Sequence, residues 1–178
     1  MNSSNALIRR LLLAAILVAQ FTGTAAAATT WVREGRVVAI QDGDTFTLLD
    51  SDKVQVTIRF AGADAPEKGQ PFYRVSGDHL ARLIFERTVR AECYKVDQYR
   101  RDVCRVYLAG KDIGAIQVEA GMAWWARPYA REQAPQERLF YEALEDRARA
   151  DSTGLWADKD PVPPWEWRRA HKAKGNNR

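Results

Sequence analysis

Apolar and polar residues alternate along three short segments in the first third of the chain, which is the pattern of half-buried strands. The segments cover residues 31–41, 45–50 and 53–60, with the turn-forming sequences "DGD" and "SD" between them. In the third segment the apolar side chains alternate from Val54 to Phe60, and Arg59 falls on the opposite face. We therefore expect three strands, with Arg59 pointing away from the core.

A helical period replaces this alternation over residues 73–87, where apolar side chains recur every three or four positions. The elements expected after it are strands at 89–96 and 102–108, a short helix ended by Gly121, and a longer helix between Pro135 and Gly154. The expected apolar stripe of the longer helix consists of Leu139, Phe140, Ala143, Leu144 and Ala148.

The last segment, residues 155–169, is rich in proline and tryptophan and shows no usable period. We expect it to be extended or irregular and packed on the body by Trp156 and Trp165. Residues 168–178 hold five basic residues and no acid, and we interpret them as a solvated, disordered end rather than as a specific contact. Three strands, a helix, two strands and then helices are the order of a five-stranded Greek-key barrel. The predicted class is therefore mainly β with α: an OB-fold barrel with about three helices.

The N-terminal sequence predicts export. Arg9 and Arg10 precede an apolar run and an alanine tract, the arrangement of a signal peptide cleaved near residues 26–28. The run is too short for a stable membrane span, and no later segment is long and apolar enough. We expect a secreted or periplasmic protein without stable membrane insertion. The expected parts are a leader at 1–28, one domain at 29–160 and a basic tail at 161–178.

The net charge and the two cysteines do not by themselves identify a class of function. The net charge of +4 falls by two units with the leader, so it does not by itself identify a nucleic-acid partner. Cys93 and Cys104 lie on the buried faces of two strand-like runs around a short polar turn. An exported chain permits a disulfide between them, although two small buried thiols would fit the same pattern.

Carboxylates and arginines near the turns provide candidate parts for phosphodiester cleavage. That reaction needs an activated water, positive charge at the transition state and a positioned phosphate. Carboxylates can hold a hard cation, and guanidinium groups match phosphate oxygens. The candidates are Asp42, Asp44, Arg59, Asp64, Glu67 and Arg101. Taken alone, Asp42 and Asp44 could be simple turn residues, and Glu67 an ordinary loop carboxylate.

Four motifs in this order resemble the staphylococcal nuclease family: "VVAIQDGDTFTL", "VTIRFAGADAPEKGQP", "DQYRRDVCRVY" and "EAGMAWW". The similarity covers residues 36–156. It implies a secreted, calcium-dependent nuclease with an OB-fold, acting on DNA and also on RNA, and we expect a monomer.

The resemblance also implies a role for each candidate residue. The implied Ca²⁺ site consists of Asp44, Asp64, the main-chain carbonyl of Ala65 and, in an outer position, Asp42. The implied catalytic residues are Glu67, as the general base, and Arg59 and Arg101, which would stabilise the phosphoryl transition state. The implied substrate contacts are Tyr99, near the nucleotide phosphate, and Tyr129, near the base.

Two positions depart from the family pattern. Arg100 stands where many relatives have glycine, and an arginine would be strained there if the backbone takes a positive φ. Arg127 stands about where a tyrosine is expected. The alternative function is therefore a non-catalytic OB-fold module that binds nucleic acid, and a third hypothesis is an exported protein-binding domain.

Overall fold

Strand pairing produces a sheet that curls round and closes on itself. The computed structural model describes residues 30–175, so the expected leader at 1–28 lies outside the described residues. The sheet has the order β3-β2-β1-β5-β6-β7, and β3 also pairs in parallel with β6. Its strands are β1 (Trp31–Ile40), β2 (Thr45–Leu49), β3 (Gln55–Phe60), β5 (Thr88–Val96), β6 (Asp102–Leu108) and β7 (Lys111–Asp112). The β3–β6 pairing closes the barrel, which confirms the predicted OB-fold class.

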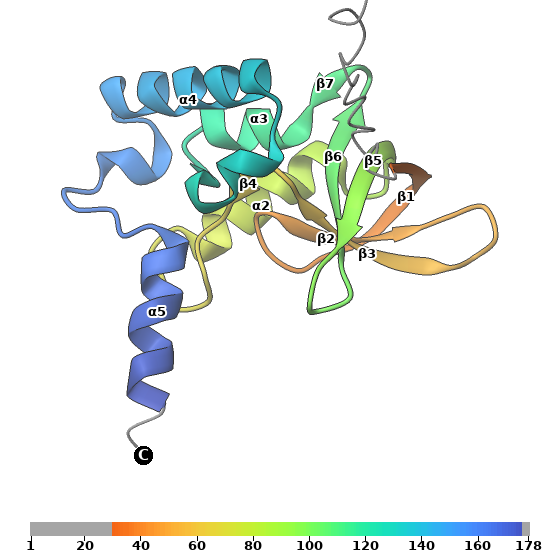
Figure 1. Ribbon diagram of the computed structural model, residues 1–178, viewed down its shortest axis with the longest axis horizontal. Helices are drawn as coiled ribbons and strands as arrows, with labels where there is room; N and C mark the ends of the chain where they lie inside the picture. The colour runs from red at the N-terminus through yellow and green to blue at the C-terminus, as the bar shows by residue number, and fades with distance from the viewer. Residues whose placement is uncertain (1–29, 176–178) are drawn as a thin grey trace, which may run out of the picture.

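The helices gather on one side of this barrel (Figure 1). They are α2 (Tyr73–Ile84), α3 (Ile113–Glu119), α4 (Pro135–Ala150) and α5 (Pro164–Gly175), with 3₁₀ turns η1 (Arg127–Glu132) and η2 (Gly154–Ala157). Helix α3 contacts β6, α2 and α4, so it lies between α4 and the strands. Two short strands, β4 (Ala63–Asp64) and β8 (Trp124–Trp125), pair antiparallel beside them. None of the helices in residues 30–175 has the length and apolar composition needed to cross a bilayer.

Two apolar clusters hold these layers together. The larger fills the barrel and includes Phe46 and Phe60, whose rings pack edge to face with centroids 5.9 Å apart. The smaller joins Trp124 to Trp156 at 5.4 Å, and Trp165 packs against it. The second cluster therefore connects the C-terminal segment to the body through the tryptophans expected to do so.

The expectation that the last segment is extended or irregular was wrong beyond residue 163. Pro164 starts α5, because a proline has no N–H to lose in the first helical turn. Glu166 in that same turn suits the positive end of the helix dipole. The segment that showed no usable period thus contained a helix start at Pro164.

The apolar stripe assigned to α4 was right for Leu144 and Ala148, which pack against the two apolar clusters, and wrong for Leu139, Phe140 and Ala143, which are exposed. Leu139 and Phe140 are 67% and 51% exposed, whereas the buried face carries Tyr141 and Glu145. The Tyr141 hydroxyl donates to Asp112 at 3.0 Å, and the Glu145 carboxylate accepts the backbone N–H of Trp125 at 3.2 Å. Polar partners therefore decide which face of α4 is buried.

Cys93 and Cys104 lie opposite each other in the β5–β6 pair and form a disulfide. Residue 104 is also the partner of Phe60 on β3, so the disulfide lies next to the seam that closes the barrel. It links residues separated by 11 positions.

We predict that replacing both cysteines by alanine lowers the free energy of unfolding by about 3 kcal/mol, because a disulfide restricts the unfolded chain by roughly this amount for such a loop. Urea denaturation of the oxidised protein and of the double variant measures the difference. A reductant should destabilise the parent protein and leave the variant unchanged. Equal urea midpoints in all four conditions would contradict the prediction.

Candidate active site

The turn between β1 and β2 holds Asp42 and Asp44 against two helices. Gln117 of α3 is fully buried and donates a 2.7 Å hydrogen bond to the carbonyl of Gly43. A Cβ atom at Gly43 would lie 1.7 Å from Ser76 Oγ of α2, so glycine is required for this close approach. Asp42 Oδ1 accepts the backbone N–H of Asp44 at 3.0 Å. The "DGD" sequence therefore fixes the direction of Asp44.

Arg59 lies between two buried carboxylates. It pairs with Thr45 across β2 and β3, which places it next to Asp44. Its Nη1 is 3.4 Å from Asp44 Oδ1, and its Nη2 is 2.7 Å from Asp64 Oδ1. Asp44 and Asp64 are only 2% and 0% exposed. Burial opposes the charged guanidinium, but the two carboxylates hold the pKa of Arg59 above its usual value.

Both carboxylate oxygens of Asp44 also accept hydrogen bonds from neighbouring residues. Its Oδ2 accepts the backbone N–H of Ala65 at 2.8 Å, and its Oδ1 accepts the Thr45 hydroxyl at 2.7 Å. The main chain of Ala65 is therefore held beside Asp44.

Glu67 is connected to this cluster by Arg168 of α5, a residue that no motif in the sequence identified. Arg168 donates to both oxygens of Asp64, at 3.0 and 2.7 Å, and its Nη1 also lies 2.5 Å from Glu67 Oε1. The side chain of Glu67 is 36% exposed, in contrast to Asp64. Arg168 therefore spans the buried and the accessible part of the acidic cluster.

Arg101 reaches the cluster from the start of β6. Because β3 and β6 run parallel, with Ile58 opposite Asp102, Arg101 comes to lie beside the strand that carries Arg59. Its Nη2 is 2.7 Å from Asp97 Oδ2, and its Nη1 is 3.4 Å from Thr45 Oγ1. The Thr45 hydroxyl in turn donates to Asp44, so it links Arg101 to the carboxylates.

Asp97 organises the turn before Arg101. Arg100 has a φ of 63°, the left-handed conformation in which an arginine is strained. Asp97 Oδ1 accepts the backbone N–H groups of Tyr99 and Arg101, at 2.9 and 3.0 Å. Burial opposes ionisation of Asp97, but its hydrogen bonds from Arg101 lower its pKa. These contacts hold Arg101 toward the cluster despite the strained residue before it.

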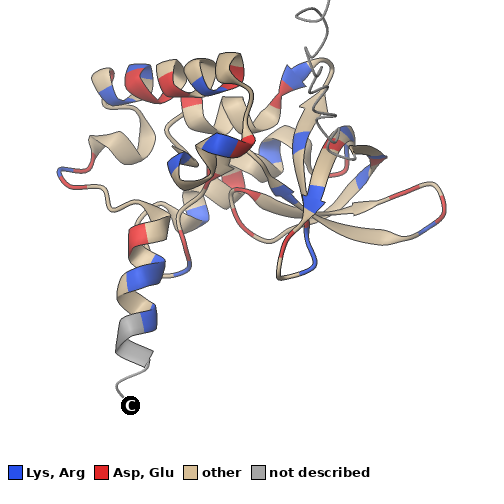
Figure 2. Ribbon diagram, viewed as in Figure 1, with Lys and Arg blue, Asp and Glu red and all other residues tan. Residues whose placement is uncertain are grey.

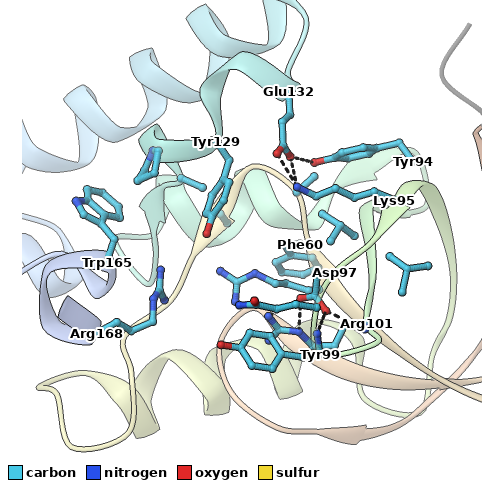
Figure 3. Close-up of a pocket in the computed structure, with 18 of the residues that line it drawn as sticks. Phe60, Tyr94, Lys95, Asp97, Tyr99, Arg101, Tyr129, Glu132, Trp165 and Arg168 are labelled. Atoms are coloured by element: carbon cyan, nitrogen blue, oxygen red, sulfur yellow. Dashed lines mark hydrogen bonds and ion pairs between the residues drawn. The ribbon is translucent and has the colours of Figure 1, made fainter. Parts of the chain in front are cut away.

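A pocket of about 900 Å³ opens above these groups, and Arg59, Glu67 and Arg101 line it. Figure 3 shows Trp165 and Arg168 on one side of it and Lys95, Asp97, Tyr99 and Arg101 on the other. Tyr99 and Tyr129 both line the pocket and are 64% and 42% exposed, so their rings are accessible.

The structure thus brings most of the residues selected from the sequence together. Asp44, Arg59, Asp64, Glu67 and Arg101 belong to one set of contacts, completed by Thr45 and Arg168. Asp42 and Ala65 join it through hydrogen bonds that involve Asp44.

Arg127 lies away from the pocket contacts: its guanidinium stacks 4.7 Å over Trp125 and pairs with Glu145. The sequence motifs did not identify Arg168, Trp165, Arg169 or Lys172. The available signals were the cluster of basic residues from residue 168 on, which we had interpreted as a solvated end, and the spacing of the four residues, which places them on one face of a helix.

The acidic cluster is suited to a hard divalent cation. Aspartate carboxylates and a main-chain carbonyl, that of Ala65, are the oxygen donors that such ions prefer. Burial and the neighbouring charge of Asp44 raise the pKa of Asp42 to about 7, which indicates that Asp42 lacks sufficient compensating positive charge. Within residues 30–175 no three His, Cys, Asp or Glu side chains are grouped as a complete metal centre. These side chains would therefore supply only part of a coordination shell, and main-chain oxygens and water would supply the rest.

Comparison with known proteins agrees with the fold and with the resemblance of the motifs. The family model described as "Staphylococcal nuclease homologue" matches residues 57–158. An "Uncharacterized endonuclease" of Haemophilus influenzae is 36% identical over 137 residues, covering 77% of this chain and 74% of the relative. An "Uncharacterized endonuclease" of Escherichia coli O157:H7 is 39% identical over 135 residues, covering 75% of this chain and 84% of the relative. A "Micrococcal nuclease" of Shigella flexneri is 38% identical over 151 residues, covering 80% of this chain and 84% of the relative.

The family model and the endonuclease and nuclease names of these relatives support a hydrolase that cleaves nucleic acid, and a cluster of carboxylates and arginines beside a pocket suits that chemistry. The chain belongs to the staphylococcal nuclease family, as the resemblance of its motifs indicated.

We predict that Arg59→Ala lowers the free energy of unfolding by about 3 kcal/mol in metal-free buffer at pH 7, because it removes a cation from two buried carboxylates. Urea denaturation measures the change. Arg90→Ala is the control, since Arg90 pairs with Glu92 at the surface and should lose less than about 1 kcal/mol. Adding Asp64→Asn to Arg59→Ala should recover part of the loss. Equal effects of the two single arginine variants would contradict the prediction.

Proposed function

We propose that this chain is an exported, Ca²⁺-dependent nuclease that hydrolyses phosphodiester bonds of DNA and RNA. The observation that supports it most strongly is the position of Arg59, which is bonded to Asp64, lies next to Asp44, and lines the same pocket as Glu67 and Arg101. The arginines and Glu67 therefore face one space, and the buried Asp44 and Asp64 lie directly behind Arg59. Family membership supports the reaction class.

Glu67 is the proposed general base. Its carboxylate is the accessible member of the acidic cluster, so a water in the pocket can reach it. The oxygen of that water forms a bond to phosphorus while its proton passes to Glu67. The bond from phosphorus to the 5′ oxygen breaks on the opposite side, and that oxygen takes a proton from solvent water, which leaves a 3′-phosphate and a 5′-hydroxyl end.

Arg59 and Arg101 are the proposed phosphate ligands. Both present guanidinium groups to the pocket, and the two-pronged geometry of this group matches two phosphoryl oxygens at once. Their charge would stabilise the additional negative charge of the transition state, by about 3 kcal/mol each. Their carboxylate partners fix their orientation before substrate binds.

Asp44, Asp64 and the carbonyl of Ala65 would hold the Ca²⁺, with Asp42 as an outer partner. When bound there, the cation would supply positive charge to the phosphoryl oxygens and favour ionisation of the water. Arg168 now binds both oxygens of Asp64 and one of Glu67, so it competes with a cation for the same carboxylates.

The alternative is a non-catalytic OB-fold module that binds nucleic acid. Two observations favour it: Arg168 occupies the carboxylate proposed as the base, and Arg100 has a strained backbone beside a proposed phosphate ligand. The experiment below separates the two functions.

We predict that the protein without its leader degrades plasmid DNA in the presence of Ca²⁺ and that this degradation stops when a chelator is added. Glu67→Gln should lower the rate roughly 10²- to 10⁴-fold, because it removes the general base. Glu119→Gln is the matched control, since the exposed Glu119 is at the end of α3 and should retain full activity. Gel electrophoresis of timed samples measures the loss of intact plasmid. DNA binding without degradation would support the alternative module.

We predict that Arg168→Ala increases the affinity for Ca²⁺ about tenfold, because the cation no longer has to displace charged hydrogen bonds from Asp64 and Glu67. Isothermal titration calorimetry without substrate measures this affinity independently of activity. Arg169→Ala is the control: it removes the same charge from the next residue of α5, and we expect less than a twofold change. A weaker affinity in Arg168→Ala would show that Arg168 supports the cation site rather than competing for it.

A further inference from the structure

Helix α5 lies beyond the residues matched by the family model, which ends at residue 158, yet it forms one side of the pocket. Four of its side chains line the pocket together with the arginines of the barrel: Trp165, Arg168, Arg169 and Lys172. A segment outside the shared domain therefore shapes the proposed substrate site.

Three contacts fix how α5 faces the pocket. Arg168 is bonded to Asp64 and Glu67, and Gln70 donates a 2.9 Å hydrogen bond to the carbonyl of Val162 just before the helix. The ring of Trp167 packs beside Gly69, where an added Cβ atom would lie 3.7 Å from it. These contacts hold the start of α5 against the loop that carries Glu67.

The pocket-facing side chains of α5 recur at the spacing i, i+3, i+4 and i+7, so they lie on one helix face. Figure 2 shows basic segments along α5 and a single acidic segment, Glu166, near its start. Glu166 is exposed and falls outside this set of positions. The face toward the pocket is therefore aromatic at one end and basic along the rest.

The basic side chains of the pocket differ in whether they already have partners. Arg59, Lys95, Arg101 and Arg168 are each paired with a carboxylate. Arg169 and Lys172 are exposed and have no ion-pair partner among residues 30–175. Their charges are therefore available to an anion from solution.

We propose that α5 forms a second wall of the substrate groove and binds one unpaired nucleic-acid strand. Arg169 and Lys172 bind phosphates next to the one that is cleaved, and Trp165 stacks on a base. The inference rests on the proposed function, because it takes the cleaved phosphate to lie at Arg59 and Arg101. A row of cations beside a half-buried tryptophan that lines the pocket is the chemistry that binds single strands, whose bases are free to stack.

Binding of a fluorescently labelled single-stranded oligonucleotide to the full chain tests the proposal, by anisotropy in a chelator so that no cleavage occurs. Arg169→Ala/Lys172→Ala should weaken binding about tenfold and reduce the slope of log K against log salt by about 1.4, or 0.7 for each lost phosphate contact. The matched control is Arg138→Ala/Arg147→Ala on α4, which removes the same charge from a helix that contributes no residue to the pocket lining. An unchanged slope, or an equal effect of the control, would overturn the proposal.

Substitutions at Trp165 test the choice of a single strand. Trp165→Leu should weaken binding of the single strand about tenfold, and Trp165→Phe should retain most of the affinity because it keeps an aromatic ring. Equal weakening on a duplex of the same length would overturn the assignment to an unpaired strand. Thermal unfolding of each variant checks that the fold is retained.

These outcomes are separate from the proposed hydrolysis. Loss of binding in the α5 variants together with full activity of Glu67→Gln would contradict the mechanism but leave the role of α5 supported. Loss of activity in Glu67→Gln together with unaffected binding in the α5 variants would contradict the role of α5 alone.

Discussion

The parallel pairing of β3 with β6 is the constraint on which the site depends. These strands are distant in the sequence, and their pairing both closes the barrel and brings Arg101 beside the strand of Arg59. Two parallel strands can be joined only by a long crossover connection, and the connection from β3 to β6 contains α2 and β5. The disulfide joins Cys104 of β6 to β5 next to this seam. Opening the seam would expose the core and separate the two arginines, so fold stability and site geometry share one cause.

The second constraint is electrostatic. Asp44 and Asp64 are buried carboxylates, and burial of a charge is tolerated only with a compensating partner. Arg59 supplies one positive charge from within the barrel, and Arg168 supplies another from α5. Because Arg168 already binds both oxygens of Asp64, a cation that binds Asp64 would have to displace Arg168. The C-terminal helix and cation binding are therefore coupled through Asp64.

The strands of the barrel could be predicted because the alternation of apolar residues is a local signal, and Arg59 was assigned correctly to the face away from the core. The two-residue pairing that buries Asp64 against Trp124 has no such signal, since it is too short to show a period. Helix α5 had a local signal in the spacing of Trp165, Arg168, Arg169 and Lys172, but these positions give no apolar period and the segment was expected to be irregular. Its contact with Asp64 spans 104 positions and follows only from tertiary packing. Local pattern therefore predicted the frame of the site, and the partners of its charges required the structure.

The pairing of Arg59, Lys95 and Arg101 with carboxylates lowers the entropic cost of binding a phosphate in the pocket. A guanidinium held by a carboxylate keeps one orientation, so little rotational freedom is lost when a phosphate replaces that carboxylate. Arg101 and Lys95 are held in this way by Asp97 and Glu132. Arg169 and Lys172 have no such partner in the described residues, and they gain the full attraction of an incoming strand. The unpaired cations of α5 thus suit the first capture of the strand, and the paired arginines of the barrel suit the ordered steps that follow.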